Sequence, residues 1–228
     1  MKKTYSQHHF TLVELLVVVG VVAILAGLVL PAVIGGIQQG RITQAKSDLA
    51  SIMMALKGVE GTYGKMVKKD STENKYIFGK NATKYKLDAN SDNLIVLGGD
   101  TATEAYYGLI AILTGMKKGV DTWNINARKI KFLEPKPNFD PAENFDDAKN
   151  TPHLWLDPWG KPYKIYINVT GADEIKVTSK KTVSAKAAGY SFGPNGTDNE
   201  GCNVDLNTCI TASDTANHKL HDDITTWN

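Results

Sequence analysis

The chain has 228 residues, a formal net charge of +2 at pH 7 and 42% hydrophobic residues. The basic residues are scattered and mixed with acidic ones, so the charge pattern predicts no nucleic-acid partner. There is no Gly-rich phosphate loop, no G-x-S-x-G elbow, no H-E-x-x-H motif and no visible nucleophile–base pair. We therefore expect a protein that is not an enzyme.

An apolar run near the N-terminus dominates the sequence. No charged side chain occurs between Glu14 and Arg41, and about 20 apolar residues suffice for a helix to cross a bilayer. Lys2 and Lys3 precede the run, so the positive-inside rule leaves the N-terminus in the cytoplasm and exports the rest. A cleaved secretory signal fits less well, because its apolar core is usually only about 7–15 residues long.

A simple signal anchor explains the length of the run and the two lysines, but it does not explain Glu14. A carboxylate at the mouth of a membrane helix is costly to bury and marks a functional site by default. The sharp change from polar to apolar residues before Phe10 suggests a processing signal instead.

Residues 9–16, His-Phe-Thr-Leu-Val-Glu-Leu-Leu, resemble the class III signal of type IV pilins and type II secretion pseudopilins. The resemblance implies that a prepilin peptidase cuts between His9 and Phe10 and that the new N-terminus is methylated. Glu14 then becomes the fifth mature residue, and Pro31 falls where the family commonly has a helix-kinking proline. His9 departs from the family pattern, which has Gly, Ala or Ser before the cut.

The resemblance gives Glu14 a physical role. Cleavage would free a cationic α-amino group on Phe10, which could pair with the Glu14 carboxylate of a neighbouring subunit. Each charge alone is costly in apolar surroundings, and pairing offsets much of that cost. Glu14 would then set the register in which subunits assemble.

The apolar pattern continues beyond the membrane segment as a stripe at heptad-like spacing. Its members are Ile42, Ala45, Leu49, Ile52, Leu56, Val59 and Tyr63. They predict an amphipathic stem helix packed on its own domain. A single helix from Glu14 to about Tyr63 would be roughly 75 Å long, and Pro31 should bend or locally melt it.

The middle of the chain contains shorter signals. Residues 75–78, 94–97 and 129–134 are predicted strands, and residues 101–113 are a predicted helix that stops at Gly115. Residues 135–152 read as an acidic loop.

The C-terminal part begins with a predicted turn at residues 157–160. Strands are then expected at 163–167, 174–178 and 188–193, forming an antiparallel sheet against the stem helix. Cys202 and Cys209 would form a short-range disulfide in an exported domain or remain two thiols in the cytosol. The membrane segment favours export.

Three C-terminal segments resemble those of major pseudopilins: residues 157–163 (DPWGKPY), 190–196 (YSFGPNG) and 221–227 (HDDITTW). In that family the last two form a calcium loop. The matched positions are the Phe192 carbonyl, Asn195, Thr197, Asp222 and Asp223. Oxygen ligands on a loop suit Ca²⁺. Asn195 replaces the usual Asp, and an insertion at 199–220 separates the two halves; the alternative is a polar loop held by the disulfide alone.

Together these features predict an α+β, pilin-like fold in which a long N-terminal helix packs on a small antiparallel sheet. The expected segments are a leader (1–9), an assembly helix (10–34), a stem (35–64), a variable region (65–156) and a C-terminal module (157–228).

The expected protein is a structural subunit of a type II secretion pseudopilus, a single-pass protein of a bacterial inner membrane with its C-terminal domain exported. Its partners would be further copies in a helical filament, minor pseudopilins, the prepilin peptidase and the inner-membrane assembly platform. The alternatives are a type IV pilin for adhesion or DNA uptake and an anchored surface-binding protein that never polymerises.

Overall fold

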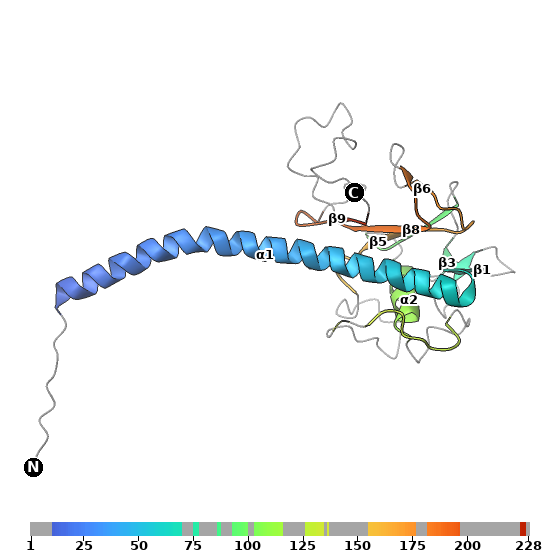
Figure 1. Cartoon of the computed structure of the whole chain (residues 1–228), viewed down its shortest axis with the longest axis horizontal. Helices are drawn as coiled ribbons and strands as arrows, with labels where there is room; N and C mark the ends of the chain where they lie inside the picture. The colour runs from blue at the N-terminus through green and yellow to red at the C-terminus, as the bar shows by residue number, and fades with distance from the viewer. Residues whose placement is uncertain are drawn as a thin grey trace, which may run out of the picture. The chain divides into compact units, whose positions relative to one another are not determined.

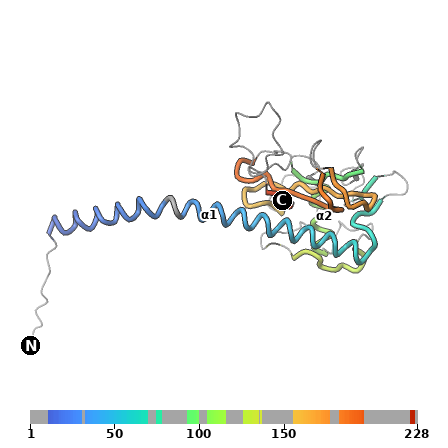
Figure 2. Tube along the Cα trace, turned by 45° about the horizontal axis from the view of Figure 1, so that its top comes forward, coloured from blue at the N-terminus to red at the C-terminus, as the bar shows by residue number. Residues whose placement is uncertain are grey.

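The computed structural model divides the chain into two compact units, Met1–Arg41 and Ile42–Asn228. The residues it describes are 11–69, 75–77, 86–87, 93–99, 103–115, 126–134, 136, 155–176, 182–196 and 224–226. Figures 1 and 2 show the course of the chain and the labelled elements.

Helix α1, Leu12–Tyr63, is 52 residues long and contributes to both units. The predicted single helix is therefore confirmed, and it ends where Gly64 adopts a positive φ of 75°. α1 continues through residue 31, so of the two outcomes expected at that proline, a bend or local melting, the melting is wrong. A proline removes one backbone donor, and the hydrogen bonds of the neighbouring turns can maintain the helix.

Unit 2 contains short strands and a second helix. The described elements are β1 (Lys68–Lys69), β2 (Tyr76–Ile77), β3 (Lys86–Leu87), β4 (Leu94–Leu97), α2 (Thr103–Leu113), β5 (Lys164–Asn168), β6 (Ile175–Lys176), β7 (Thr182–Val183), β8 (Ala187–Ser191) and β9 (Ile224–Thr225). All pairings between these strands are antiparallel. The sheets have the orders β1-β2-β3, β4-β5-β8-β9 and β6-β7, which gives an α+β architecture.

The stem half of α1 packs on the four-stranded sheet. All seven residues of the heptad-like stripe either belong to the main core cluster or pack against it, which confirms the predicted amphipathic helix. Ile95 and Leu97 of β4, with Ile165 and Ile167 of β5, face the same cluster, and α2 adds Leu109 and its neighbours. The alternation of these strand residues places their apolar side chains on the helix-facing side.

Gly189 of β8 permits this close packing. A Cβ atom there would lie 2.8 Å from Cδ1 of Ile165 and 3.3 Å from Cδ2 of Leu49 on α1. The opposite face of the sheet has its own aromatic cluster, in which the rings of Tyr166 and Tyr190 stack at 6.1 Å. Both faces of the sheet are therefore packed.

One predicted strand is wrong, because residues 129–134 form no strand. The backbone N–H groups of Phe132 and Leu133 both donate to the Leu113 carbonyl at the end of α2, at 2.9 and 3.0 Å. The N–H of Ile130 donates to the side chain of Asn126 at 3.0 Å. These donors therefore cap a helix end and frame a turn instead of pairing with a neighbouring strand. The strands expected at 75–78, 94–97, 163–167, 174–178 and 188–193 are present as β2, β4, β5, β6 and β8. The expected single C-terminal sheet is wrong in one respect, because β6 pairs with β7 in a separate two-stranded sheet.

Candidate functional site

The start of α1 is a capping box formed by Thr11 and Glu14. The Glu14 carboxylate accepts hydrogen bonds at Oε2 from both the backbone N–H and the hydroxyl of Thr11, each at 2.8 Å. In return, Thr11 Oγ1 accepts the Glu14 N–H at 3.3 Å. This reciprocal pattern satisfies donors that a helix start leaves unpaired. Oε1 of Glu14 has no hydrogen-bond partner in the part of the chain that the structure describes.

The apolar run that follows is exposed within its own unit. Leu12 is 80% exposed and Leu28 72% exposed, and every large hydrophobic residue with described exposure between them is more than half exposed. α1 is long and apolar enough to cross a membrane, judged by length and composition. This surface requires cover by lipid or by other protein, because large apolar patches are unfavourable in water.

The expected processing site lies outside the described residues, since both His9 and Phe10 do. Glu14 is described, and it lies three residues from the Thr11 cap at the helix mouth. Residue 31 lies within α1. The capping role of Glu14 was not among the predictions, although the T-x-x-E spacing at residues 11–14 is the sequence pattern of a capping box.

The Asp157 side chain connects the turn at residues 157–160 to strand β8. Oδ1 of its buried carboxylate accepts the backbone N–H groups of Trp159 and Lys161 at 3.0 and 2.8 Å. Gly160 has a φ of 89° and donates to the Asp157 carbonyl at 3.1 Å, which confirms the predicted turn. Oδ2 accepts the Ser191 hydroxyl at 2.6 Å, so one carboxylate ties the turn to the end of β8.

Ser191 passes this link on to the next turn. Its Oγ accepts the Gly193 N–H at 3.1 Å, and the Gly196 N–H donates to the Gly193 carbonyl at 3.2 Å. Phe192 is fully buried and Asn195 half-buried in this segment, so two calcium candidates lie in one ordered turn.

Strand β9 was not predicted from the sequence, and two of the other calcium candidates precede it in the chain. Ile224 pairs with Ser191, and Asp222 and Asp223 directly precede Ile224 in the sequence. β8 and β9 form the edge pair of the four-stranded sheet.

Three of the calcium candidates, Thr197, Asp222 and Asp223, lie outside the described residues, as do Cys202 and Cys209. Among the described residues, no three His, Cys, Asp or Glu side chains form a metal-binding group.

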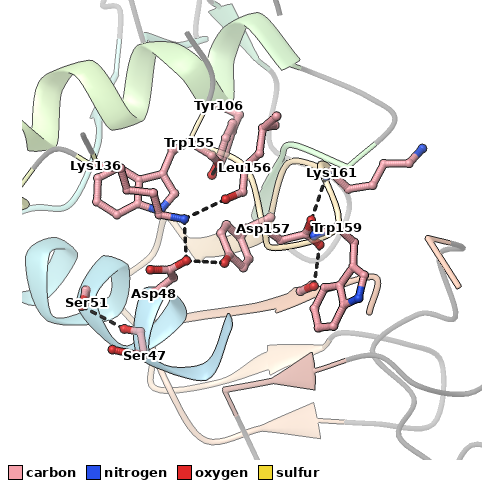
Figure 3. A network of polar contacts seen from close by, with 12 residues as sticks. Ser47, Asp48, Ser51, Tyr106, Lys136, Trp155, Leu156, Asp157, Trp159 and Lys161 are labelled. Atoms are coloured by element: carbon pink, nitrogen blue, oxygen red, sulfur yellow. Dashed lines mark hydrogen bonds and ion pairs between the residues drawn. The ribbon is translucent and has the colours of Figure 1, made fainter. Parts of the chain in front are cut away.

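A polar network that the sequence did not suggest joins α1 to the C-terminal module (Figure 3). Oδ2 of Asp48 on α1 accepts the Tyr163 hydroxyl at 2.7 Å and the Lys136 ammonium at 2.5 Å. The ammonium also donates to the Leu156 carbonyl at 2.7 Å and lies 5.1 Å from the ring centre of Trp155. Asp48 falls between core positions of the stripe, and its partners lie far away in the sequence.

The tyrosines at this network are held neutral. Burial, followed by the nearby Asp48 carboxylate, raises the pKa of Tyr163 far above its usual value. Burial also raises the pKa of Tyr106, whose hydroxyl donates to the Trp155 carbonyl at 2.6 Å. Both phenols therefore act as hydrogen-bond donors. The network stabilises the packing of α1 on the C-terminal module, and we call it the Asp48 clamp.

Comparison with known proteins gives no relative: no family model, no curated protein and no solved structure matches the chain.

Proposed function

We propose that the chain is a membrane-anchored structural subunit of a type II secretion pseudopilus. The observation that carries the proposal is the carboxylate of Glu14, fixed by Thr11 at the mouth of an exposed apolar helix. The pilin-like form of the α+β fold, in which a long N-terminal helix packs on an antiparallel sheet, is part of the proposal.

The apolar surface of α1 supports two uses of one element. In a single copy the bilayer covers it, and in a filament the helices of neighbouring copies replace the lipid. Thr11 supplies two donors to Oε2 of Glu14, which lowers the cost of keeping this carboxylate near lipid in a single copy. Oε1 can then accept the α-ammonium group of Phe10 from a neighbouring copy after cleavage.

The C-terminal module favours a pseudopilus over a pilus. The segments at 157–163, 190–196 and 221–227 resemble those of major pseudopilins, and the Asp157 carboxylate bonds the first of them to the second. A type IV pilin is the second candidate, since the N-terminal features serve it equally. The partners proposed are the prepilin peptidase, the inner-membrane assembly platform, minor pseudopilins and further copies of the chain.

The proposal is tested by replacing Glu14 in cells that express the assembly machinery. We expect Glu14→Ala to remain in the membrane fraction and to be absent from sheared filaments. Glu14→Gln separates the effect of the charge from the effect of the helix cap, because glutamine retains the capping acceptor but removes the charge. We expect it to fail in assembly as well; normal filaments from either variant would contradict the role of the charge.

A further inference from the structure

A groove lies between the last turns of α1 and the start of β8, wholly within unit 2. Its volume is about 500 Å³, which is within the usual range for sites that hold small ligands. Lys57 and Glu60 of α1 line it together with Asp173 and Lys186. The nearly buried side chain of Met66 adds an apolar part to the same groove.

The groove combines two positive and two negative side chains. The Lys186 ammonium donates to Oε1 of Glu60 at 2.7 Å. Hydrogen bonding to Glu60 and attraction by its charge raise the pKa of Lys186, and the charge of Asp173 acts in the same direction. Neither Lys57 nor Asp173 forms an ion pair with any residue that the structure describes. One ammonium and one carboxylate of the groove therefore remain available to a ligand.

The loop that carries Asp173 is held in place by hydrogen bonds. Asn168 accepts the Thr170 N–H at Oδ1 at 2.9 Å, and its Nδ2 donates to the Glu174 carbonyl at 2.7 Å. The Ser184 hydroxyl donates to the Asp173 carbonyl at 3.4 Å. The backbone at Asp173 is therefore attached to the segment that leads into β8.

The edge of β8 adds backbone hydrogen-bonding groups to the groove. The Asn168 N–H donates to the Lys186 carbonyl at 2.8 Å, so the polar backbone groups of Lys186 point toward β5. Those of the next residue, Ala187, point to the opposite edge, because neighbouring residues of an antiparallel strand alternate in this respect. β9 pairs with the other end of β8, and no described residue pairs with Ala187 on that edge. Ala187 can therefore offer one N–H and one carbonyl to an extended chain.

We propose that this groove binds a short peptide that carries both a free ammonium group and a free carboxylate. A purely cationic or purely anionic ligand would meet as many repelling charges as attracting ones, whereas a zwitterion matches both. The peptide ammonium pairs with Asp173, its carboxylate pairs with Lys57, and its backbone bonds to Ala187. This activity goes beyond the proposed filament role and does not depend on it.

The test uses the full chain in uncharged detergent micelles, isotope-labelled at its methionine methyl groups, with trialanine as the probe. We expect the NMR signal of Met66 to shift, with half-saturation at about 1 mM, because a small and partly solvated ligand gains little affinity per atom. Met66→Leu identifies this signal. Met54 is 72% exposed on α1 and does not line the groove, so its signal should stay unchanged.

Two derivatives of the probe separate its charges. N-acetyl-trialanine lacks the ammonium and trialanine amide lacks the carboxylate, and each should bind about fivefold more weakly than trialanine. Binding of both derivatives as tightly as trialanine would overturn the proposal. Equal binding of free alanine would overturn the part assigned to the peptide backbone.

Two variants test the residues of the groove. Lys57→Gln and Asp173→Asn should each weaken trialanine binding about fivefold. The matched controls are Lys46→Gln and Glu174→Gln, which remove the same kinds of charge from exposed positions outside the groove. Unchanged binding by the controls, together with loss in the first two variants, would support the site. Equal loss in all four, or no shift of Met66 at about 10 mM trialanine, would overturn it.

Discussion

Asp48 shows how one side chain can join separate parts of the fold. Its carboxylate lies on α1, its donors are Lys136 and Tyr163, and its side chain is 14% exposed. We expect Asp48→Ala to lower the free energy of unfolding by about 2–4 kcal/mol, because it leaves a partly buried ammonium and a buried phenol without their acceptor. Denaturant unfolding of the micelle-bound chain, followed by tryptophan fluorescence, measures this loss.

Lys46 provides the control for Asp48. It lies two residues earlier on α1 and is exposed, so Lys46→Ala should change the unfolding free energy by less than about 0.5 kcal/mol. Equal effects of the two substitutions would show that the Asp48 clamp contributes nothing specific.

The buried tyrosines give the fold a dependence on alkaline pH. Burial raises the pKa of Tyr163 and of Tyr106 in the folded state, so their contribution is complete below the unfolded pKa of about 10 and is lost as pH rises above it. Each should remove about 1.4 kcal/mol of stability per pH unit above pH 10. Hydrogen bonding to Glu60 raises the pKa of Lys186 and acts in the same direction.

Tyr163→Phe isolates one of these tyrosines. The variant loses its hydrogen bond to Asp48, so it should be less stable than the parent chain at pH 8. Its stability should nevertheless fall less steeply between pH 10 and 11.5, because one titrating group is gone. Parallel curves for the two proteins over that range would refute the assignment.

At the scale of the element, two glycines near the end of α1 distinguish packing from helix propensity. A Cβ on Gly58 would lie 2.8 Å from Cδ1 of Phe132, whereas a Cβ on Gly61 would meet no atom within 4 Å. We expect Gly61→Ala to stabilise the fold by about 0.5–1 kcal/mol, because alanine favours the helix. Gly58→Ala should destabilise it by about 1 kcal/mol or more, because overpacking at Phe132 exceeds that gain. Thermal unfolding of both variants measures the difference, and equal shifts would contradict the packing of Phe132 on α1.

The elements also show what the sequence could and could not specify. The spacing from Ile42 to Tyr63 was sufficient to predict the stem helix, because a 3.6-residue period is a local property. The strand predicted at 129–134 is absent because backbone N–H groups in this segment donate to Leu113 and Asn126. The local alternation of apolar and polar residues does not reveal these partners. β9 has two residues, too few for a periodic signal.

The same distinction holds for the candidate sites. Glu14 was recognisable as one acid before an apolar run, and its three-residue spacing from Thr11 is a local pattern. The Asp48 network required the tertiary fold, because Asp48 and Lys136 are 88 residues apart in the sequence.

At the scale of the whole molecule, the expected calcium site offers a ligand test. If Phe192, Asn195 and their proposed partners bind Ca²⁺ with a Kd of about 0.1 mM, 10 mM Ca²⁺ should stabilise the fold by about 2.7 kcal/mol. Asn195→Asp should increase the stabilisation by Ca²⁺, because it adds a charged oxygen ligand. An unchanged melting temperature at 10 mM Ca²⁺ in both proteins would count against the site.

The central claim is that the chain is processed and assembled as a pilin-like subunit. Mass spectrometry of the N-terminus of the protein purified from membranes of its native host tests this most directly. The proposed function predicts a mature chain that begins at Phe10 and carries an N-methyl group. A chain that retains the leader, or is cut after the apolar run, would contradict it.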